Sequence, residues 1–391
     1  METRHDVIVV GGGLVGASCA LALARAGLDT VLVEGQAPCG VPPGEAGWDS
    51  RIYAISPGSV RFLEALGVWA RLPAQRLQAV SAMHIRGDDG RSFLHFSAYE
   101  AGVAALAVIV ESRALSRALW QALPGCPQVV CHCPARPSRL AVEADWARLF
   151  LDDGRVLAAK LIVGADGARS WVRQQAGLRF RDKDYRQMGV VANFACEKPH
   201  GGIARQWFRS DGILAWLPLP GNHLSMVWST DTAHAAKLLA LPPGELAARV
   251  AEVSDVVGRL TCITPAAAFP LHLIQVDTVV APRLALIGDA AHQVHPLAGQ
   301  GVNLGFGDAE VLTRELSRRG VRDCGELALL RRYERARKED VLAMQFVTDA
   351  LKELFAHPHP VVGVLRNLGL SATQRAGFLK QALVRHALGT S

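Results

Sequence analysis

The sequence predicts an α/β fold in which a nucleotide-binding region is interrupted by an antiparallel sheet and followed by a helical C-terminus. The apolar run Asp6–Val10 leads directly into a Gly-x-Gly-x-x-Gly turn and a helix. Between about residues 183 and 269 the pattern changes to short apolar runs separated by Pro and Gly turns. Such runs are typical of antiparallel sheets, whereas alternating strands and helices indicate a parallel sheet. We therefore expect both kinds of sheet in one chain.

The glycine turn predicts a Rossmann-like dinucleotide site rather than an incidental loop. Gly11, Gly13 and Gly16 allow a tight turn, and the helix that opens at Leu14 and Val15 offers unpaired N–H groups to a phosphate. The next strand, Thr30–Glu34, ends on a carboxylate eighteen residues after Gly16. An acid at that position can accept a hydrogen bond from a ribose 2′-hydroxyl.

Composition limits the class of protein without naming it. The 391 residues, 50% of them hydrophobic, allow about two domains with an ample core. A net charge of +6 favours an anionic cofactor or an acidic membrane surface and is too modest to indicate nucleic-acid binding. No secretory signal or membrane-spanning run is recognisable, so we expect a cytoplasmic protein with reduced thiols. The cluster Cys126, Cys131, His132 and Cys133 lacks zinc-site spacing, and we expect no metal.

The first half of the chain should alternate between helices and strands. The segment Asp49–Ser59 is expected to open a helix that ends at Gly67, with Arg51 just before it as either a solvated side chain or a cofactor cation. Residues 76–98 alternate around Gly87–Gly90 and predict a hairpin. Further on we expect a helix at Ser112–Leu123, a turn at Asp152–Gly154 and a buried strand from Ala159 that ends at Gly164-Ala-Asp166-Gly167.

The second half contains the inserted sheet and the return of the parallel pattern. Strands are expected at Gly189–Cys196, Ala204–Phe208, Ile213–Leu219 and His223–Ser229, and helices at Pro243–Val253, Gly301–Arg318 and Gly325–Phe355. Arg283–Ile287 is a strand that leads into Gly288-Asp289. We divide the chain into a discontinuous nucleotide-binding domain (1–75, 101–182 and 270–325), an inserted β-sheet domain (76–100 and 183–269) and a C-terminal helical region (326–391).

The end of the chain is basic. No acidic residue follows Glu353, whereas Arg366, Arg375, Lys380 and Arg385 are present beside an apolar helical face. Two interpretations stay open: an amphipathic tail that rests on an anionic membrane or a partner, and an ordinary helix docked on its own domain.

Three motifs then carry a resemblance that runs the length of the chain. Gly11-x-Gly13-x-x-Gly16, Gly164-Ala-Asp166-Gly167 and Gly288-Asp289 resemble, in this order, the motifs of the group A FAD-dependent aromatic monooxygenases. Longer phrases are similar to those of the ubiquinone-biosynthesis hydroxylase family: Asp49-Ser-Arg51, Val110-Glu-Ser-Arg113, Leu214-Ala-Trp-Leu-Pro-Leu-Pro220, Met226-Val-Trp-Ser229 and Gly288-Asp-Ala-Ala-His-Gln-Val-His-Pro-Leu-Ala-Gly-Gln-Gly-Val-Asn-Leu-Gly-Phe306.

The resemblance implies a glutathione-reductase-type domain that binds FAD. It places Gly11 to Gly16 at the pyrophosphate, Glu34 at the adenosine ribose and Asp289 at the ribityl hydroxyls. Cofactor-side cations would be Arg51 and Arg113. Beside the flavin ring it places Pro296, Gly299, Gln300, Gly301, Val302 and Asn303.

Three further sets of residues have more than one interpretation. Asp166 and Arg169 belong to a motif associated with the cofactor and with NADPH or NADH, although a purely structural strand-to-turn role is the alternative. His292 and His295 flank the flavin loop and are expected to cap a helix or pack the loop rather than bind a metal. The inserted sheet is the expected substrate wall, and strand alternation allows only some members of this set to face it: Gln206, Trp207, Trp216, Pro218 and Trp228.

The implied activity is hydroxylation of the ring of a prenylated phenol or quinol. NADPH or NADH reduces FAD, O₂ adds to the reduced flavin, and the resulting hydroperoxide delivers oxygen to the ring. A membrane surface or a ubiquinone-biosynthesis complex is the implied partner, with a location at or near the membrane. The alternatives are hydroxylation of a small soluble aromatic compound and a non-catalytic FAD-binding scaffold. No catalytic side chain is predicted.

Overall fold

The computed structural model describes residues 3–37, 47–89, 92–209, 211–254, 257–293 and 301–356, with side chains described to residue 345. The predicted flavin-loop residues Pro296, Gly299 and Gln300, together with His295, lie outside the described residues, as does the basic tail after residue 356. The expectations for those segments therefore stay predictions.

The first sheet contains the predicted parallel βαβ core. Its order is β18-β19-β11-β1-β2-β8, and β10 joins β11 and β9 at one side. Its strands are β1 (Thr3–Val10), β2 (Thr30–Val33), β8 (Val129–His132), β9 (Pro137–Val142), β10 (Ala147–Leu151), β11 (Val156–Gly164), β18 (Val280–Ala281) and β19 (Leu284–Leu286). Val7 and Val9 of β1 pack in a core with α1 (Leu14–Arg25), α4 (Ser112–Ala122) and α8 (Gly301–Ser317). Ile8 and Val10 face the opposite core, which includes Val172 of α5 (Trp171–Gln175).

A three-stranded sheet corrects one prediction. The helix expected to open between Asp49 and Ser59 is preceded by a strand, β3 (Ile52–Ile55), and begins only at α2 (Pro57–Ala65), where the Ser56 side chain caps it. β3 and β4 (Gln78–Val80) both pair with β7 (Ala107–Glu111), and α3 (Ala98–Ala101) lies before β7. The strand was missed because its partner is more than fifty residues away, and local periodicity carries no information about long-range pairing.

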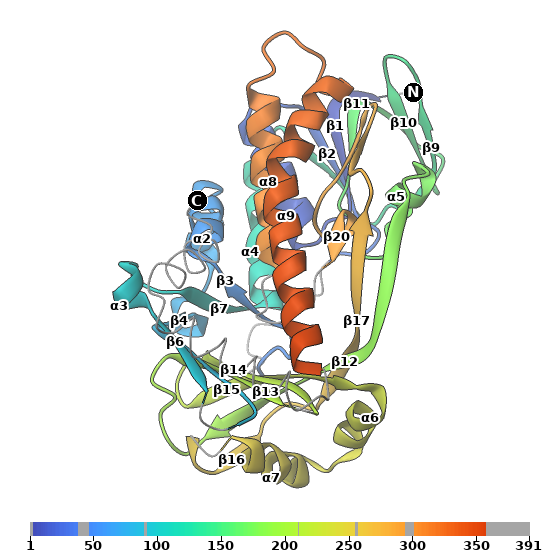
Figure 1. The fold of residues 1–391 in the computed structure, drawn as a ribbon. Helices are drawn as coiled ribbons and strands as arrows, with labels where there is room; N and C mark the ends of the chain where they lie inside the picture. Colours follow the sequence, from blue (N-terminus) through green and yellow to red (C-terminus); the bar gives the residue numbers. More distant parts are fainter. Residues whose placement is uncertain are drawn as a thin grey trace.

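The second sheet is the predicted antiparallel insertion (Figure 1). Its order is β20-β17-β12-β15-β14-β13-β5-β6, and β16 pairs with β12. Its strands are β5 (Ala82–Arg86), β6 (Phe93–Ser97), β12 (Phe180–Cys196), β13 (Ile203–Arg209), β14 (Gly212–Leu219), β15 (His223–Asp231), β16 (Leu260–Cys262), β17 (Ala267–Val276) and β20 (His292–Gln293). The hairpin prediction is confirmed, since β5 and β6 pair antiparallel.

Strand β12 is much longer than the segment Gly189–Cys196 predicted from sequence. Its 17 residues start at Phe180, and the first five are exposed. Their polar character hides the strand from a hydrophobic pattern, but Phe180–Asp184 pair with β17 along their length. β12 and β17 thereby connect the two large sheets (Figure 1).

The two faces of the second sheet have different partners, which divides the five candidate wall residues into two groups. Trp207, Trp216 and Trp228 pack in one core with α6 (Thr232–Ala240) and α7 (Pro243–Val253). Pro218 is opposite Leu224, another residue of that core. On the other face, Asn193 donates Nδ2 to the carbonyl of Asp49, 2.8 Å away. We call this the near face.

Gln206 belongs to the near face, because its register partners Ala215 and Val227 lead across the sheet to Val191, two residues from Asn193. Of the five predicted wall residues, the structure therefore directs Gln206 alone toward the loop that contains Asp49.

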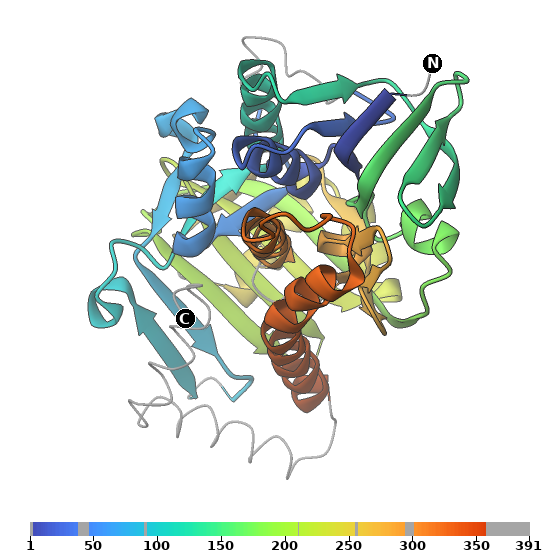
Figure 2. The same cartoon turned by 90° about the horizontal axis from the view of Figure 1, so that it is seen from above.

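The C-terminal helices match their predicted positions. α8 is followed by α9 (Leu327–Ala356), which runs from the first sheet toward the second beside β12 and β17 (Figures 1 and 2). Within the described residues, no helix is both long and apolar enough to span a bilayer.

Candidate cofactor site

The turn after β1 leaves the N-terminus of α1 open. Gly11 has φ +106°, and a Cβ on Gly16 would lie 1.9 Å from the carbonyl oxygen of Gly11. Gly13 caps α1 without a side-chain hydrogen bond, and a Cβ built on it would meet no atom within 4 Å. Unpaired N–H groups therefore face open space, as a pyrophosphate requires. Val15 lies beneath this turn, 3.3 Å from the position of a Cβ on Gly288.

Glu34 lies beside the same turn at the end of β2. Its Oε2 accepts a hydrogen bond from Gly12 N at 2.5 Å, and its Oε1 accepts one from Gln36 N at 2.8 Å. Trp120 donates Nε1 to Gly12 O at 2.9 Å and fixes the turn from the other side. Each carboxylate oxygen keeps a second acceptor site, so the arrangement fits a ribose hydroxyl.

The backbones of the two predicted cations, Arg51 and Arg113, are both hydrogen-bonded to the Asp49 carboxylate, to which the sequence assigned no role. Asp49 Oδ1 accepts a hydrogen bond from Arg51 N at 3.0 Å, and Oδ2 accepts one from Arg113 N at 2.9 Å. The Arg113 guanidinium lies 3.6 Å from the same Oδ2. Asp49 thus holds both segments in register, and the exposed guanidinium of Arg51 lies over the ring of Tyr53, 5.6 Å from its centroid.

A second ion pair supports Asp49. Glu111 accepts Asp49 N at 2.7 Å and receives two hydrogen bonds from Arg76, both at 2.7 Å. The Arg76 guanidinium also stacks 4.0 Å over the ring of Trp48. Together with the bond from Asn193, these contacts connect the loop to two sheets. Because the partners are separated by 62 and 144 residues, no local motif could have revealed them.

Asp166 has a structural role in this fold. Its Oδ1 accepts Ser170 Oγ at 2.5 Å, and its Oδ2 accepts Val172 N at 3.0 Å. These bonds cap α5, which is the strand-to-turn role, while the cofactor role of Asp166 stays a prediction; Arg169 is exposed. The residue that sequence reasoning passed over is Arg173, whose buried guanidinium donates to Ala168 O at 2.7 Å and to Ala290 O at 2.8 Å.

Asp289 lies in the 3₁₀ turn Gly288–Ala290. Burial raises the pKa of its carboxyl group, although the nearby charges of His292 and Arg51 oppose that effect. Within the described residues the carboxyl accepts no hydrogen bond. The Asp289 side chain is half-buried, and a carboxylate that loses water without gaining hydrogen-bond donors costs free energy. Several ribityl hydroxyls would supply the missing donors, which makes this carboxyl the strongest fit to FAD among the predicted residues.

The start of α8 offers backbone rather than side chains. Val302 is buried, and Asn303 donates Nδ2 to Ala54 O at 2.8 Å and accepts Ser56 N on Oδ1 at 3.0 Å. The Asn303 amide therefore joins α8 to β3. Gly301 is half-buried at the helix N-terminus, and a Cβ built on it would meet no described atom within 4 Å. Within the described ranges, no group of three or more His, Cys, Asp or Glu side chains could hold a metal ion.

Comparison with known proteins defines the class. The FAD binding domain family matches residues 4–348, a range that includes both large sheets. The match and the open, donor-rich turn after β1 agree, so FAD is the cofactor of this protein. The chain is an FAD-dependent monooxygenase by class.

Two curated relatives narrow the class. The chain is 39% identical to the ubiquinone hydroxylase UbiL of Rhodospirillum rubrum over 98% of its own length and 90% of the relative. It is 37% identical to the 3-demethoxyubiquinol 3-hydroxylase of Escherichia coli K12 over 98% of both chains. The chain belongs to the ubiquinone hydroxylase family, as the sequence motifs predicted. Among solved structures, a mutant of PqsL from P. aeruginosa matches with a TM-score of 0.79 and 25% identity over 93% of this chain and 100% of the other.

Proposed function

We propose that this protein hydroxylates the aromatic ring of a polyprenylated phenol or quinol on the path to ubiquinone, with NADPH or NADH and O₂ as co-substrates. The observation that carries the proposal is the end-to-end match with relatives named ubiquinone hydroxylase and 3-demethoxyubiquinol 3-hydroxylase. The open glycine turn supports it, as does the Asp289 carboxyl, which accepts no hydrogen bond from the described residues.

We assign the cofactor roles as follows. The N–H groups of the Gly11–Gly16 turn hold the pyrophosphate, Glu34 holds the adenosine ribose and Asp289 holds the ribityl chain. Arg51 and Arg113 lie on the cofactor side, positioned by Asp49. Pro296, Gly299 and Gln300 lie outside the described residues, and with the backbone of Gly301, Val302 and Asn303 they remain the proposed flavin loop.

Bound FAD supplies the redox chemistry and the transfer of oxygen, while the side chains of the protein orient the ring and exclude water. The first sheet accordingly forms the proposed FAD-binding domain and the second sheet the proposed substrate domain. On the near face, Asn193 and Ser225 are directly opposite each other. Both are fully buried, and Asn193 Oδ1 and Ser225 Oγ have no hydrogen-bond partner among the residues that the structure describes. We propose that this pair recognises a ring hydroxyl of the substrate.

The decisive experiment supplies the purified FAD-bound protein with two phenols, one carrying a prenyl chain and one water-soluble. We expect NADPH or NADH oxidation to be stimulated by the prenylated phenol, and its product to gain one oxygen by mass spectrometry. Activity with the soluble phenol alone would favour the alternative of a small-aromatic hydroxylase. Bound FAD without turnover on any phenol would favour the non-catalytic scaffold.

The cellular partner is a separate proposal. A prenylated substrate resides in a membrane, so we propose a cytoplasmic protein that associates with the membrane surface or with a ubiquinone-biosynthesis complex. The basic tail after residue 359, which lies outside the described residues, is the proposed contact. Deleting it should reduce association with vesicles containing anionic lipid while FAD remains bound. Unchanged vesicle association would support the docked-helix alternative.

A further inference from the structure

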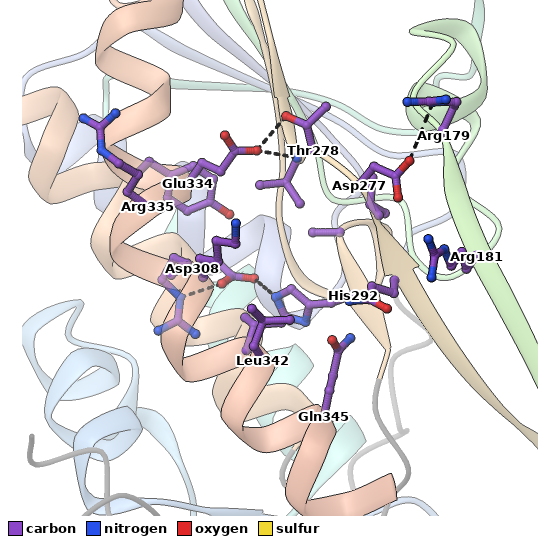
Figure 3. Close-up of a pocket in the computed structure, with 18 residues that line it drawn as sticks. Arg179, Arg181, Asp277, Thr278, His292, Asp308, Glu334, Arg335, Leu342 and Gln345 are labelled. Carbon is purple, nitrogen blue, oxygen red and sulfur yellow. Dashed lines mark hydrogen bonds and ion pairs between the residues drawn. The ribbon is translucent and has the colours of Figure 1, made fainter.

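A buried carboxylate of α8 lies directly behind the Asp289 turn. Asp308 is 0% exposed and accepts three hydrogen bonds: from Gly288 N at 2.9 Å, from His292 Nε2 at 2.7 Å and from Arg337 Nε at 2.7 Å. Figure 3 shows the bond between Asp308 and the imidazole of His292, and the guanidinium of Arg337 in α9 donates to the other carboxylate oxygen. The first two donors share the same oxygen, Oδ2, and they flank Asp289 in the sequence.

Asp308 is held in its ionised form. Burial alone would raise the pKa of its carboxyl group, but the charges and hydrogen bonds of His292 and Arg337 bring the pKa below its usual value. The anionic Asp308 can only accept, so His292 must carry a proton on Nε2. Its other ring nitrogen, Nδ1, is then unprotonated in the neutral imidazole and protonated in the imidazolium. The bond between His292 and Asp308 therefore persists in both charge states of the histidine.

Arg337 extends this network into α9. Besides Asp308, it donates to Asp340 at 2.7 Å and to Leu304 O at 3.2 Å. Tyr333, one turn earlier, donates its hydroxyl to Leu286 O at 2.8 Å, in the strand that leads to the turn. Two residues of α9 thus contact the segments that precede and support Asp289.

The turn is therefore held from two sides. On one side lies Val15 of α1, because a Cβ built on Gly288 would be 3.3 Å from the Val15 side chain. On the other side, Asp308 and His292 line a half-open cavity of about 680 Å³, together with residues of α9 and β17 (Figure 3). A turn that lost its bonds to Asp308 could move into this cavity and carry Asp289 with it.

We propose that His292, Asp308 and Arg337 form a brace that sets the affinity for FAD by fixing the position of Asp289. His292 and Asp308 are positioning residues, since they act through the backbone of the turn, and α9 becomes part of the cofactor site through Arg337. The proposal rests on the FAD-binding part of the proposed function and is independent of the substrate.

The test uses two substitutions of His292 in the FAD-loaded protein. Gln places an N–H donor where Nε2 lies, whereas Leu removes the donor and keeps the volume. Equilibrium dialysis against graded FAD concentrations, followed by flavin fluorescence, gives the dissociation constant. We expect His292→Leu to weaken FAD binding by about tenfold or more, the effect of losing one hydrogen bond to a charged group, and His292→Gln to stay within about threefold of the unaltered protein.

A matched control separates the brace from general destabilisation. His234 is a partly buried histidine of α6 that hydrogen-bonds Thr230 at 2.9 Å, in the second sheet and outside the brace. His234→Leu should lower the unfolding temperature without changing FAD affinity. The proposal is overturned if His292→Leu binds FAD as tightly as His292→Gln, or if His234→Leu weakens FAD equally. If the unaltered protein itself fails to retain FAD, the cofactor assignment fails instead.

Discussion

The turns that follow β1 and β19 lie against each other at one edge of the first sheet, yet they are held by opposite means. The first turn is fixed by absent side chains: a Cβ on Gly11 would lie 2.5 Å from Ala165 O, and one on Gly16 would lie 1.9 Å from Gly11 O. The second turn, Gly288–Ala290, is fixed by present ones: Asp308, His292 and Arg173 all bond its backbone or its flanks.

The difference is one of sequence separation: the contacts that fix the first turn involve mainly residues close together in the chain, whereas those that fix the second come from distant elements. Steric limits between neighbouring residues depend on only a few adjacent positions, so the first turn can be recognised from a short sequence motif. The second turn depends on donors and acceptors from α5, α8 and α9. If the comparison is correct, the first turn should be broken by one methyl group and the second by one charge.

The largest effect is expected from Gly16→Ala. The added methyl would lie 1.9 Å from a backbone oxygen, a distance that no side-chain adjustment can relieve. We expect FAD binding to be lost in purified protein, measured as the ratio of flavin to protein absorbance. Gly125→Ala is the control, since its Cβ would meet nothing within 4 Å. Retention of stoichiometric FAD by Gly16→Ala would show that the turn is not held by sterics.

The next effect tests the charge that holds the second turn. Arg337→Met leaves the fully buried Asp308 without its guanidinium partner and should lower the free energy of unfolding by about 3–5 kcal/mol, measured by urea titration at saturating FAD. The double variant Arg337→Met with Asp308→Leu removes the stranded charge and should lose less than Arg337→Met alone. Equal losses in the two variants would mean that the ion pair does not stabilise this turn.

How far the sequence predicts the molecule follows from the same distinction. The parallel core, the hairpin, the inserted sheet and helix α8 all have local patterns, and the structure has each of them. β3 and the first residues of β12 were not predicted, because their pairing partners are distant and their exposed residues lack an apolar pattern.

The candidate site divides in the same way. Glu34 beside the glycine turn could be placed from spacing alone. The roles of Asp49 and Asp308 could not be predicted, because each carboxylate accepts hydrogen bonds from elements that are distant in the sequence. The choice among the five candidate wall residues stayed open in the sequence, because alternation states that neighbouring residues take opposite faces without stating which face meets the other sheet.

A third prediction separates the fold of the first turn from its function. A Cβ on Gly13 would meet no protein atom within 4 Å, and Gly13 has an extended backbone with φ −65° that alanine adopts without strain. Gly13→Ala should therefore unfold at the same temperature as the unaltered protein when FAD is absent. Its methyl group would enter the space proposed for the pyrophosphate. FAD affinity should therefore fall by about tenfold, the effect of losing one hydrogen bond to the phosphate. An unaltered dissociation constant for FAD would mean that the pyrophosphate does not bind at this turn.

The smallest effect concerns the charge of Asp289 and is a matter of pH. Burial raises the pKa of this carboxyl in the FAD-free protein, whereas donors from the ribityl chain would lower it, so FAD binding releases a proton. A carboxyl group whose pKa is raised by burial destabilises the folded protein at pH values above that pKa, where it is ionised, and this cost disappears as the pH falls and the group takes up a proton. FAD binds the ionised carboxylate, so protonation of Asp289 competes with FAD binding. FAD affinity should therefore decrease as the pH falls through the raised pKa of Asp289, by at most about tenfold per pH unit. His292, Arg51 and Asp308 face the same carboxyl and set where the decrease begins. Asp289→Asn should bind FAD more weakly at neutral pH and lose this pH dependence, and an unchanged slope in Asp289→Asn would assign the titration to one of those neighbours.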